Sequence, residues 1–287
     1  MNFETYLNQA WNDHATQSPL VADSFSKGFA LVETPDQLVQ LSALVTHVMG
    51  EHLARWRDGA SILKSFMNHP VYELKTELEK ALLRSVAVLE VGENLNLKLD
   101  NFTLSDQIRI MAVAASALAE REVARAEGLL RNALRLAETG LDHKDPAHRS
   151  LAITGNNLAC ALEEKKSRSS AETDLMILAA QTGRKYWELA GTWEEVAIAE
   201  YRLAMTFIQA KDAAKAFDHA QKSIEIRRVN QASDRFMFFG YQALALAEKQ
   251  SKNELGFQKA VEQAHQFFAK LNAKDQAYCQ PSLTSLI

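Results

Sequence analysis

The feature that most constrains the fold is an internal repeat of 45 residues between Gln107 and Gln266. An aliphatic residue followed by alanine recurs at this interval, as Val113-Ala114, Leu158-Ala159 and Leu203-Ala204. A further alanine follows each pair by twelve positions, at Ala126, Ala171 and Ala216. A compressed fourth copy begins at Leu244-Ala245. A fixed period of this length indicates a repeat architecture in which each copy packs on the next.

Each copy predicts two helices joined by a tight turn, because its apolar residues recur at steps of three and four. Helix start signals, such as Asp145-Pro146 and Thr192, mark where copies begin. The expected helix pairs are 105–120 with 122–140, 146–165 with 169–189, 193–210 with 212–231, and 234–250 with 253–270. The sequence therefore predicts an all-α chain.

The composition agrees with helices and narrows the class of protein. There are 5 prolines and 11 glycines in 287 residues, and the net charge of −4 is mild. No segment is basic enough for a nucleic-acid footprint, and none has the ~18 consecutive apolar residues of a membrane span. The N-terminus does not resemble a signal peptide. Two cysteines, Cys160 and Cys279, suggest a reducing compartment. We expect a cytoplasmic protein that binds neither nucleic acids nor membranes.

The first hundred residues predict further helices that match the repeat only loosely. A first helix, ending near Thr16, carries an apolar stripe of Phe3, Tyr6, Leu7 and Trp11. We expect the stripe to pack as core and cap the first hairpin; otherwise it would be an exposed dimerisation or partner surface. Later helices are expected from Ser18-Pro19, from Thr34-Pro35, through Trp56 to the break at His69-Pro70, and from about Val71 to Val91.

Residues 92–102 interrupt this helical pattern. Leu95, Leu97 and Leu99 alternate with Asn96 and Lys98, which is a period of two. This alternation favours an extended connector whose leucines pack on neighbouring helices. The alternative is a mobile flap over a groove.

Three regions follow from these patterns. We expect an N-terminal helical region with degenerate helix-hairpin repeats and capping helices, an array of about four repeats, and a C-terminal tail. Their expected bounds are 1–101, 102–271 and 272–287. Because its periodicity is weak, the tail is expected to be loose beyond about Tyr278.

The third copy carries the spacing of a known repeat motif. Its leucine, small, aromatic and apolar positions are occupied by Leu203, Ala204, Phe207, Ala216, Ala220 and Ile224, with Lys211-Asp212 at the turn. The earlier copies match through Leu158, Ala159, Leu162, Ala171 and Leu175, and through Val113, Ala114, Ala117, Ala126 and Leu130. The array thus resembles the tetratricopeptide repeat (TPR) family. Its period, Asp145-Pro146 and Asn156-Asn157-Leu158-Ala159 resemble the long, kinesin-light-chain type.

The resemblance implies a right-handed superhelical solenoid of antiparallel helix pairs with a concave groove that binds peptides or proteins. The chain departs from the family pattern, because no copy has the motif's helix-A tryptophan or its closing proline. By the family's register, the candidate partner-binding residues of the groove are Met111, Asn156, Asn157, Cys160, Tyr201, Arg202, Met205 and Gln242. The N-terminal helices or the tail could instead cover them.

Asn157 and Arg202 occupy the same repeat position in adjacent copies. An amide can donate to and accept from a peptide backbone, and a guanidinium can pair with a carboxylate. The alternative is that both side chains bond within the groove or to solvent. Some family members clamp a peptide's carboxylate with five polar residues. Met111, Ala115 and Ile198 stand at three of those positions, so a complete clamp is absent.

Catalytic and metal-binding patterns are scarce. His47 and Glu51, four residues apart on one helix with His52 next to Glu51, could be a fragment of a metal site. The paired His-Glu-x-x-His order of a zinc helix is missing, however, and no third ligand is evident in the sequence. Asp13-His14 is interpreted as a solvated pair, and Cys160 would need a nearby base to act as a nucleophile. The basic runs Lys165-Lys166-Ser167-Arg168 and Arg227-Arg228 are expected to face water at helix ends. We therefore expect no catalytic residue, metal or cofactor.

These patterns favour a non-catalytic protein- or peptide-binding scaffold of TPR-like type. The alternative is a peptide-sensing regulatory protein of bacterial signalling type without a DNA-binding domain, since Lys27 is the only lysine or arginine before Arg55. An enzyme would need a deep pocket with perturbed titratable groups. A homodimer is left open.

Overall fold

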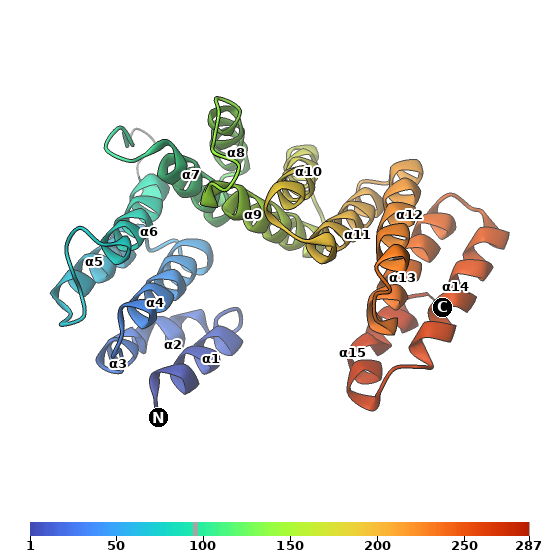
Figure 1. Cartoon of the computed structure of the whole chain (residues 1–287), viewed down its shortest axis with the longest axis horizontal. Coiled ribbons are helices and arrows are strands. Elements are labelled where there is room, and N and C mark those ends of the chain that lie inside the picture. Colours follow the sequence, from blue (N-terminus) through green and yellow to red (C-terminus); the bar gives the residue numbers. More distant parts are fainter. Residues whose placement is uncertain (94–96, 287) are drawn as a thin grey trace. The chain divides into compact units, whose positions relative to one another are not determined.

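The computed structural model describes residues 1–93 and 97–286, which form fifteen α-helices and no strand (Figure 1). The prediction of an all-α chain is confirmed. The helices pack mainly on their neighbours in sequence. Two compact units result, Met1–Asp142 and His143–Ile287. Within the described parts of the chain, the helices lack the length and apolar content that crossing a bilayer requires.

The helices predicted from the repeat are all present, with ends within a few residues of those expected. The N-terminal unit contains α7 (Leu104–Leu118) and α8 (Val123–Ala137). The C-terminal unit contains α9 (Pro146–Glu164), α10 (Ser170–Ala190), α11 (Trp193–Gln209), α12 (Ala213–Val229), α13 (Asp234–Gln250) and α14 (Glu254–Phe268).

Side-chain caps explain why these helices begin where they do. The Asp145 carboxylate accepts from the backbone N–H of Ala147 at 2.8 Å, and Pro146 occupies the first helical position of α9. Capping boxes start α10 at Ser169 and α11 at Thr192. Each box satisfies backbone donors that the first helical turn leaves unpaired.

The alanine of each repeated dipeptide lies in the core. Ala114, Ala159, Ala204 and Ala245 are all fully buried. Small side chains at these positions let neighbouring helices approach closely. The second alanine of the repeat is less regular, because Ala126 and Ala216 are buried but Ala171 is exposed.

The family resemblance implies that Ala171, at a small position of the motif, packs where two helices cross closely, and this expectation is wrong. Five residues separate α9 from α10, against three between α11 and α12. Ala171 consequently falls in the first turn of α10, before the helices meet. The backbones of α9 and α10 come close together at two glycines, where a Cβ on Gly155 would lie 2.6 Å from the backbone nitrogen of Gly183.

Eight helical segments precede α7 in the described part of the N-terminal unit. These are α1 (Phe3–Asp13), α2 (Ser18–Asp23), α3 (Phe25–Ala30), α4 (Pro35–His47), the π-helix η1 (Val48–His52), α5 (Trp56–Ser65), the 3-10 helix η2 (Phe66–Asn68) and α6 (Glu77–Glu93). Phe3 and Tyr6 are buried, and α1 packs on α2, α3 and α4. The expectation that the stripe on the first helix is core is confirmed for these two side chains, whereas Leu7 and Trp11 are half-buried.

Three expectations in this unit need correction. The second predicted helix divides at Ser24, whose hydroxyl donates to the Val21 carbonyl at 2.7 Å and also contacts the Tyr6 hydroxyl. Gly50 is expected to end the helix that starts at Thr34-Pro35, because glycine disfavours a helix interior, but the chain continues through it as η1 to His52. The long helix begins at Glu77 rather than near Val71, because Glu79 folds back to accept from the Lys75 backbone N–H at 2.6 Å.

In the connector after α6, the described leucines pack on neighbouring helices, which agrees with an extended connector rather than a mobile flap. Leu97, Leu99 and Phe102 pack against a buried cluster formed by α6 and α7, whose members are Ala87, Val88, Val91, Ile110 and Ala114. The predicted period-2 pattern also includes Leu95 and Asn96, which lie outside the described residues.

The tail is helical, contrary to the expectation that it is loose beyond Tyr278. Helix α15 spans Ala273–Thr284 and is capped by Asn272, whose side chain accepts from the Asp275 N–H at 2.9 Å. Cys279, Leu283 and Leu286 join the apolar core of the C-terminal unit. Burial of these three side chains stabilises a segment whose own periodicity is weak.

Candidate functional site

A cavity of about 340 Å³ in the C-terminal unit is lined by residues of α11, α12, α13 and α15. Its described lining contains three arginines, four aromatic side chains and one isoleucine, and no carboxylate. The lining residues are Arg202, Arg227, Arg235, Tyr201, Phe236, Phe239, Tyr278 and Ile198. A cavity of this size fits a small ligand or a side chain of a partner.

Arg227 reaches the cavity from the core face of α12. Ala220, Ile224 and Arg227 follow one another at steps of four and three, so the arginine shares the buried face of the helix. Only 2% of its surface is exposed. One terminal nitrogen donates to the Phe236 carbonyl, and the guanidinium lies 5.6 Å from the ring centroids of both Tyr201 and Phe236.

Arg227 has no carboxylate partner among the described residues. Its Nε atom is buried and meets no acceptor in the part of the chain that the structure describes. Burial lowers the pKa of Arg227 to about 10, so the side chain stays charged at neutral pH. The C-terminal end of α12 and the two aromatic rings offset part of this cost. A buried cation of this kind favours an anionic partner.

The other two arginines of the cavity are paired within the chain. Arg202 donates to the Glu163 carboxylate, and Thr206 donates to the same group at 2.5 Å. Arg235 donates to Asp275 at 2.9 Å. The Arg202 Nε is nevertheless buried without an acceptor among the described residues. Positive charge in the cavity thus exceeds the negative charge that the chain supplies to it.

Aromatic rings form the apolar walls. The Tyr201 hydroxyl donates to the Gln242 side-chain oxygen at 3.1 Å, and burial raises the pKa of Tyr201 to about 12. Its ring lies 5.9 Å from that of Phe239, which lies 6.1 Å from that of Tyr278. Tyr278 is 69% exposed, which places it at the open side of the cavity. Such a lining can hold an apolar group next to the arginine charges.

The structure brings several predicted groove residues together here. Tyr201 and Arg202 line the cavity, Gln242 lies buried behind Tyr201, and Met205 packs against the adjoining core. Cys160 lies close enough to Arg202 for their charges to interact. Burial raises the pKa of the Cys160 thiol despite this, which disfavours its reactive thiolate.

The remaining predicted residues do not line the cavity. Asn157 is exposed on α9. Asn156 is half-buried, and its side-chain oxygen finds no donor among the described residues. Met111 is buried in the N-terminal unit. Of the two alternatives raised for Arg202, the contact within the chain is the one that the structure shows.

Arg227 is a residue of this cavity that the sequence analysis places wrongly. The Arg227-Arg228 run was expected to face water, but only Arg228 does so, paired with Glu225 at 2.9 Å. The repeat contained the signal, because Arg227 lies three residues after Ile224 and so on the apolar face of α12. Arg168, in the other basic run, donates to three carbonyls at the end of α9.

A second buried charge in this unit is fully paired. The Glu200 carboxylate accepts from Arg184 Nε at 2.5 Å, and His219 Nδ1 lies 2.6 Å from its other oxygen. Burial alone would raise the pKa of Glu200, but the contacts with His219 and Arg184 outweigh it and lower the pKa. Since its charge is balanced within the chain, this cluster needs no external partner.

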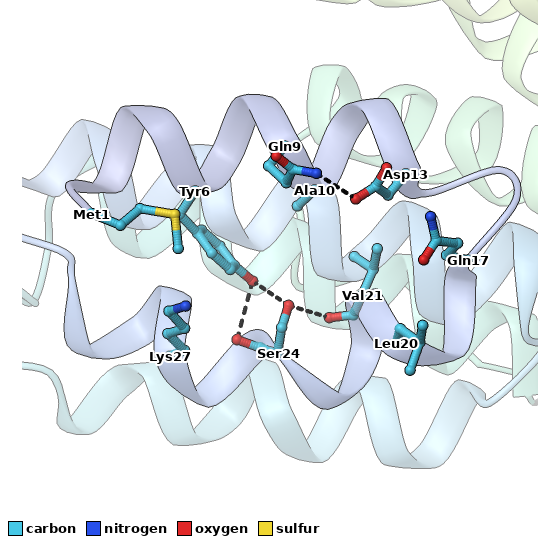
Figure 2. A pocket seen from close by; sticks show the side chains of 10 residues that line it. All are labelled: Met1, Tyr6, Gln9, Ala10, Asp13, Gln17, Leu20, Val21, Ser24 and Lys27. Atoms are coloured by element: carbon cyan, nitrogen blue, oxygen red, sulfur yellow. Dashed lines mark hydrogen bonds between the residues drawn. The ribbon is translucent and has the colours of Figure 1, made fainter.

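A smaller cavity lies in the N-terminal unit, between α1 and the α2–α3 segment (Figure 2). Gln17 and Lys27, which also line it, are exposed to solvent. Among its other polar groups, Figure 2 shows the Tyr6 hydroxyl bonded to Ser24 and Gln9 donating to Asp13 at 2.9 Å. Because these groups satisfy each other, this cavity offers a weaker site than the arginine-lined one.

Comparison of the chain with models of protein families, with curated proteins and with solved structures finds no match.

Proposed function

We propose that the chain is a non-catalytic binding protein, of TPR-like solenoid type with a right-handed superhelix, that takes up a protein or peptide partner. The arginine-lined cavity of the C-terminal unit receives an acidic group of that partner. The observation that carries this proposal is Arg227, a buried cation for which the described residues supply no carboxylate.

The proposal rests on the energetics of a buried charge. Removing a guanidinium from water costs several kcal/mol unless an anion or good hydrogen bonds replace the lost hydration. A guanidinium has five N–H donors, and that of Arg227 makes one hydrogen bond and two ring contacts. A carboxylate from a partner would complete this set.

The shape and lining of the cavity favour a peptide group over a phosphodiester. The guanidinium fork matches a carboxylate and a phosphate alike, so the preference comes from Phe239 and Tyr278, which can hold an apolar side chain beside the charge. The net charge of −4 gives no general attraction for nucleic acid. An extended peptide with an acidic residue or free C-terminus next to an aromatic residue fits these features best.

Selection from a library of random hexapeptides, displayed with free C-termini, would test the proposal. Wild-type protein should enrich peptides that combine an acidic group with an aromatic side chain. Arg227→Met should weaken binding of an enriched peptide by at least about thirtyfold, because that peptide's carboxylate loses its partner. Fluorescence anisotropy of the labelled peptide gives the affinity.

The neighbouring arginine provides a matched control. Arg228→Met removes the same charge from an exposed position of the same helix turn and should leave the affinity within about threefold of wild type, as expected for an exposed charge. No enrichment of acidic peptides, or equal losses in the two variants, would count against the cavity as the binding site. Enrichment of a basic peptide would contradict the proposed chemistry.

A further inference from the structure

Three histidines from separate elements converge in the N-terminal unit. His14 follows the last residue of α1, His47 ends α4, and His52 ends η1. One ring nitrogen from each lies within 4.8 Å of the other two. The interpretation of Asp13-His14 as a solvated pair is therefore wrong. The centroid of the His14 ring lies 4.9 Å from that of His47 and 5.1 Å from that of His52.

The π-helix explains how two histidines on one stretch of chain can meet. In an α-helix, residues five apart point about 140° away from each other. In η1 the backbone hydrogen bond widens, with the Leu53 N–H donating to the Val48 carbonyl at 3.0 Å. The wider turn brings His47 and His52 onto one face, with their Nε2 atoms 3.1 Å apart. Single π-turns of this kind are frequent at functional sites.

Hydrogen bonds orient two of the rings. His14 Nδ1 lies 2.5 Å from the Trp11 carbonyl, which can only accept, so this nitrogen carries the proton and Nε2 keeps its lone pair. His47 Nδ1 lies 3.3 Å from the Glu51 carboxylate, which favours the same tautomer. Metal-binding histidines are usually held in this way, with the other ring nitrogen donating to a carbonyl or a carboxylate.

The spacing of the nitrogens suits a tetrahedral metal. Two imidazole nitrogens on one Zn²⁺ ion, each about 2.0–2.1 Å from it, stand about 3.3 Å apart. The His47 and His52 Nε2 atoms already lie at 3.1 Å. As found, these two nitrogens share one hydrogen. A bound metal would replace that hydrogen, with the proton of His52 moving to its Nδ1 atom or to solvent.

Neighbouring residues hold the cluster in place. Arg121 donates to the backbone carbonyls of Glu51 and His52 at 2.6 and 2.8 Å, and the Ser116 hydroxyl contacts the Glu51 carboxylate at 3.4 Å. Burial and the neighbouring His47 lower the pKa of His52, which favours its neutral, metal-binding form. The side chains of His47 and Glu51 are 26% and 24% exposed, so an ion can reach them from solvent.

We propose that His14, His47 and His52 bind a divalent transition-metal ion of the Zn²⁺ type, with Glu51 orienting His47 and a fourth position open to solvent. Three neutral imidazoles are ligands that suit Zn²⁺ and its neighbours in the first transition row. The site lies wholly in the N-terminal unit and does not depend on the function proposed for the arginine-lined cavity.

Isothermal titration of the full chain with ZnCl₂, after treatment with a chelator, would test the site. One ion should bind per chain. His14→Gln, His47→Gln and His52→Gln should each weaken binding at least about a hundredfold, because each removes a ligand. Glu51→Gln should weaken it about 10- to 100-fold by releasing His47. His143→Gln and His265→Gln alter exposed histidines elsewhere and should leave affinity unchanged.

Cobalt provides a second readout. Co²⁺ at the site should give the intense visible absorption of a four-coordinate ion, and Glu51→Gln should shift that band without removing a ligand. The proposal is overturned if wild type binds no Zn²⁺ at micromolar concentrations, or if the His14 and His52 variants bind as wild type does. It is also overturned if the His143 control loses binding equally. Because Glu51→Gln keeps all three ligands, it tests the site even where a histidine variant fails to fold.

Discussion

The arginine-lined cavity of the C-terminal unit and the histidine cluster of the N-terminal unit gather basic side chains in different ways. Arg227 is charged at every physiological pH, so its burial carries an electrostatic cost that contacts within the chain offset only in part. The three histidines can meet because imidazoles can stay neutral and share hydrogens. This difference is the reason that we propose an anionic partner for one cluster and a cation for the other.

The largest effect should come from unpairing Arg202. Glu163→Ala removes the carboxylate that balances a side chain only 21% exposed. We expect a loss of about 3–5 kcal/mol in the free energy of unfolding, measured by urea denaturation. The adjacent Glu164→Ala, at an exposed position, should cost under ~0.5 kcal/mol. Equal losses would show that Arg202 does not depend on its partner.

Mutation of Arg227 is expected to increase the free energy of unfolding rather than to decrease it. Arg227→Met keeps most of the side-chain volume and removes the buried charge, so the free energy of unfolding should rise by about 1–3 kcal/mol. The gain should be present at neutral pH and shrink above about pH 10, where the wild-type guanidinium begins to lose its proton in the folded state. A thermal melt at pH 7 that shows destabilisation would mean that the charge is satisfied within the chain.

Acid unfolding tests the paired charge of Glu200, which stabilises the fold, in contrast to the unpaired charge of Arg227. The lowered pKa of Glu200 means that its ionised form stabilises the fold at neutral pH. This contribution should be lost as pH falls below about 4.5 and through the lower pKa of the folded state. Glu200→Gln should therefore be less stable than wild type at pH 7 and show a flatter decline in acid. Parallel curves for the two proteins between pH 6 and 3 would refute this.

The smallest effect is expected in the histidine cluster without metal. His52→Gln removes a half-buried neutral ring that carries no buried charge. Its free energy of unfolding in chelator should lie within ~1 kcal/mol of wild type. Saturating Zn²⁺ should then raise the stability of wild type but not of the variant. A large loss in chelator would indicate that the cluster is a structural core element.

The sequence predicted the helices of the repeat well because three signals agree there. Apolar spacing, cap residues such as Ser169 and Thr192, and the repeated alanines all indicate the same helix pairs. Such local signals suffice when each helix packs on its neighbours in the chain. Ala171 shows the limit, because a change of loop length shifts the packing without changing the period.

The two clusters were harder to predict, for different reasons. Arg227 sits at an apolar position, and charge alone suggested a solvent-facing side chain. Periodicity, given more weight than charge, would have identified it. His14 could not be assigned in this way, because it joins His47 and His52 only through the packing of α1 and the π-turn of η1. Neither of these features leaves a periodic trace in the sequence.

Helix α15 gives the C-terminal unit a further property. It contains Pro281, which removes a backbone hydrogen bond from its interior, and it supplies Tyr278 to the wall of the cavity. A helix weakened in this way is among the first parts of a protein to detach. A partner group that contacts Tyr278 would hold it in place and shield it from proteases. The time for which the protein survives in a cell would then report how often its cavity is filled.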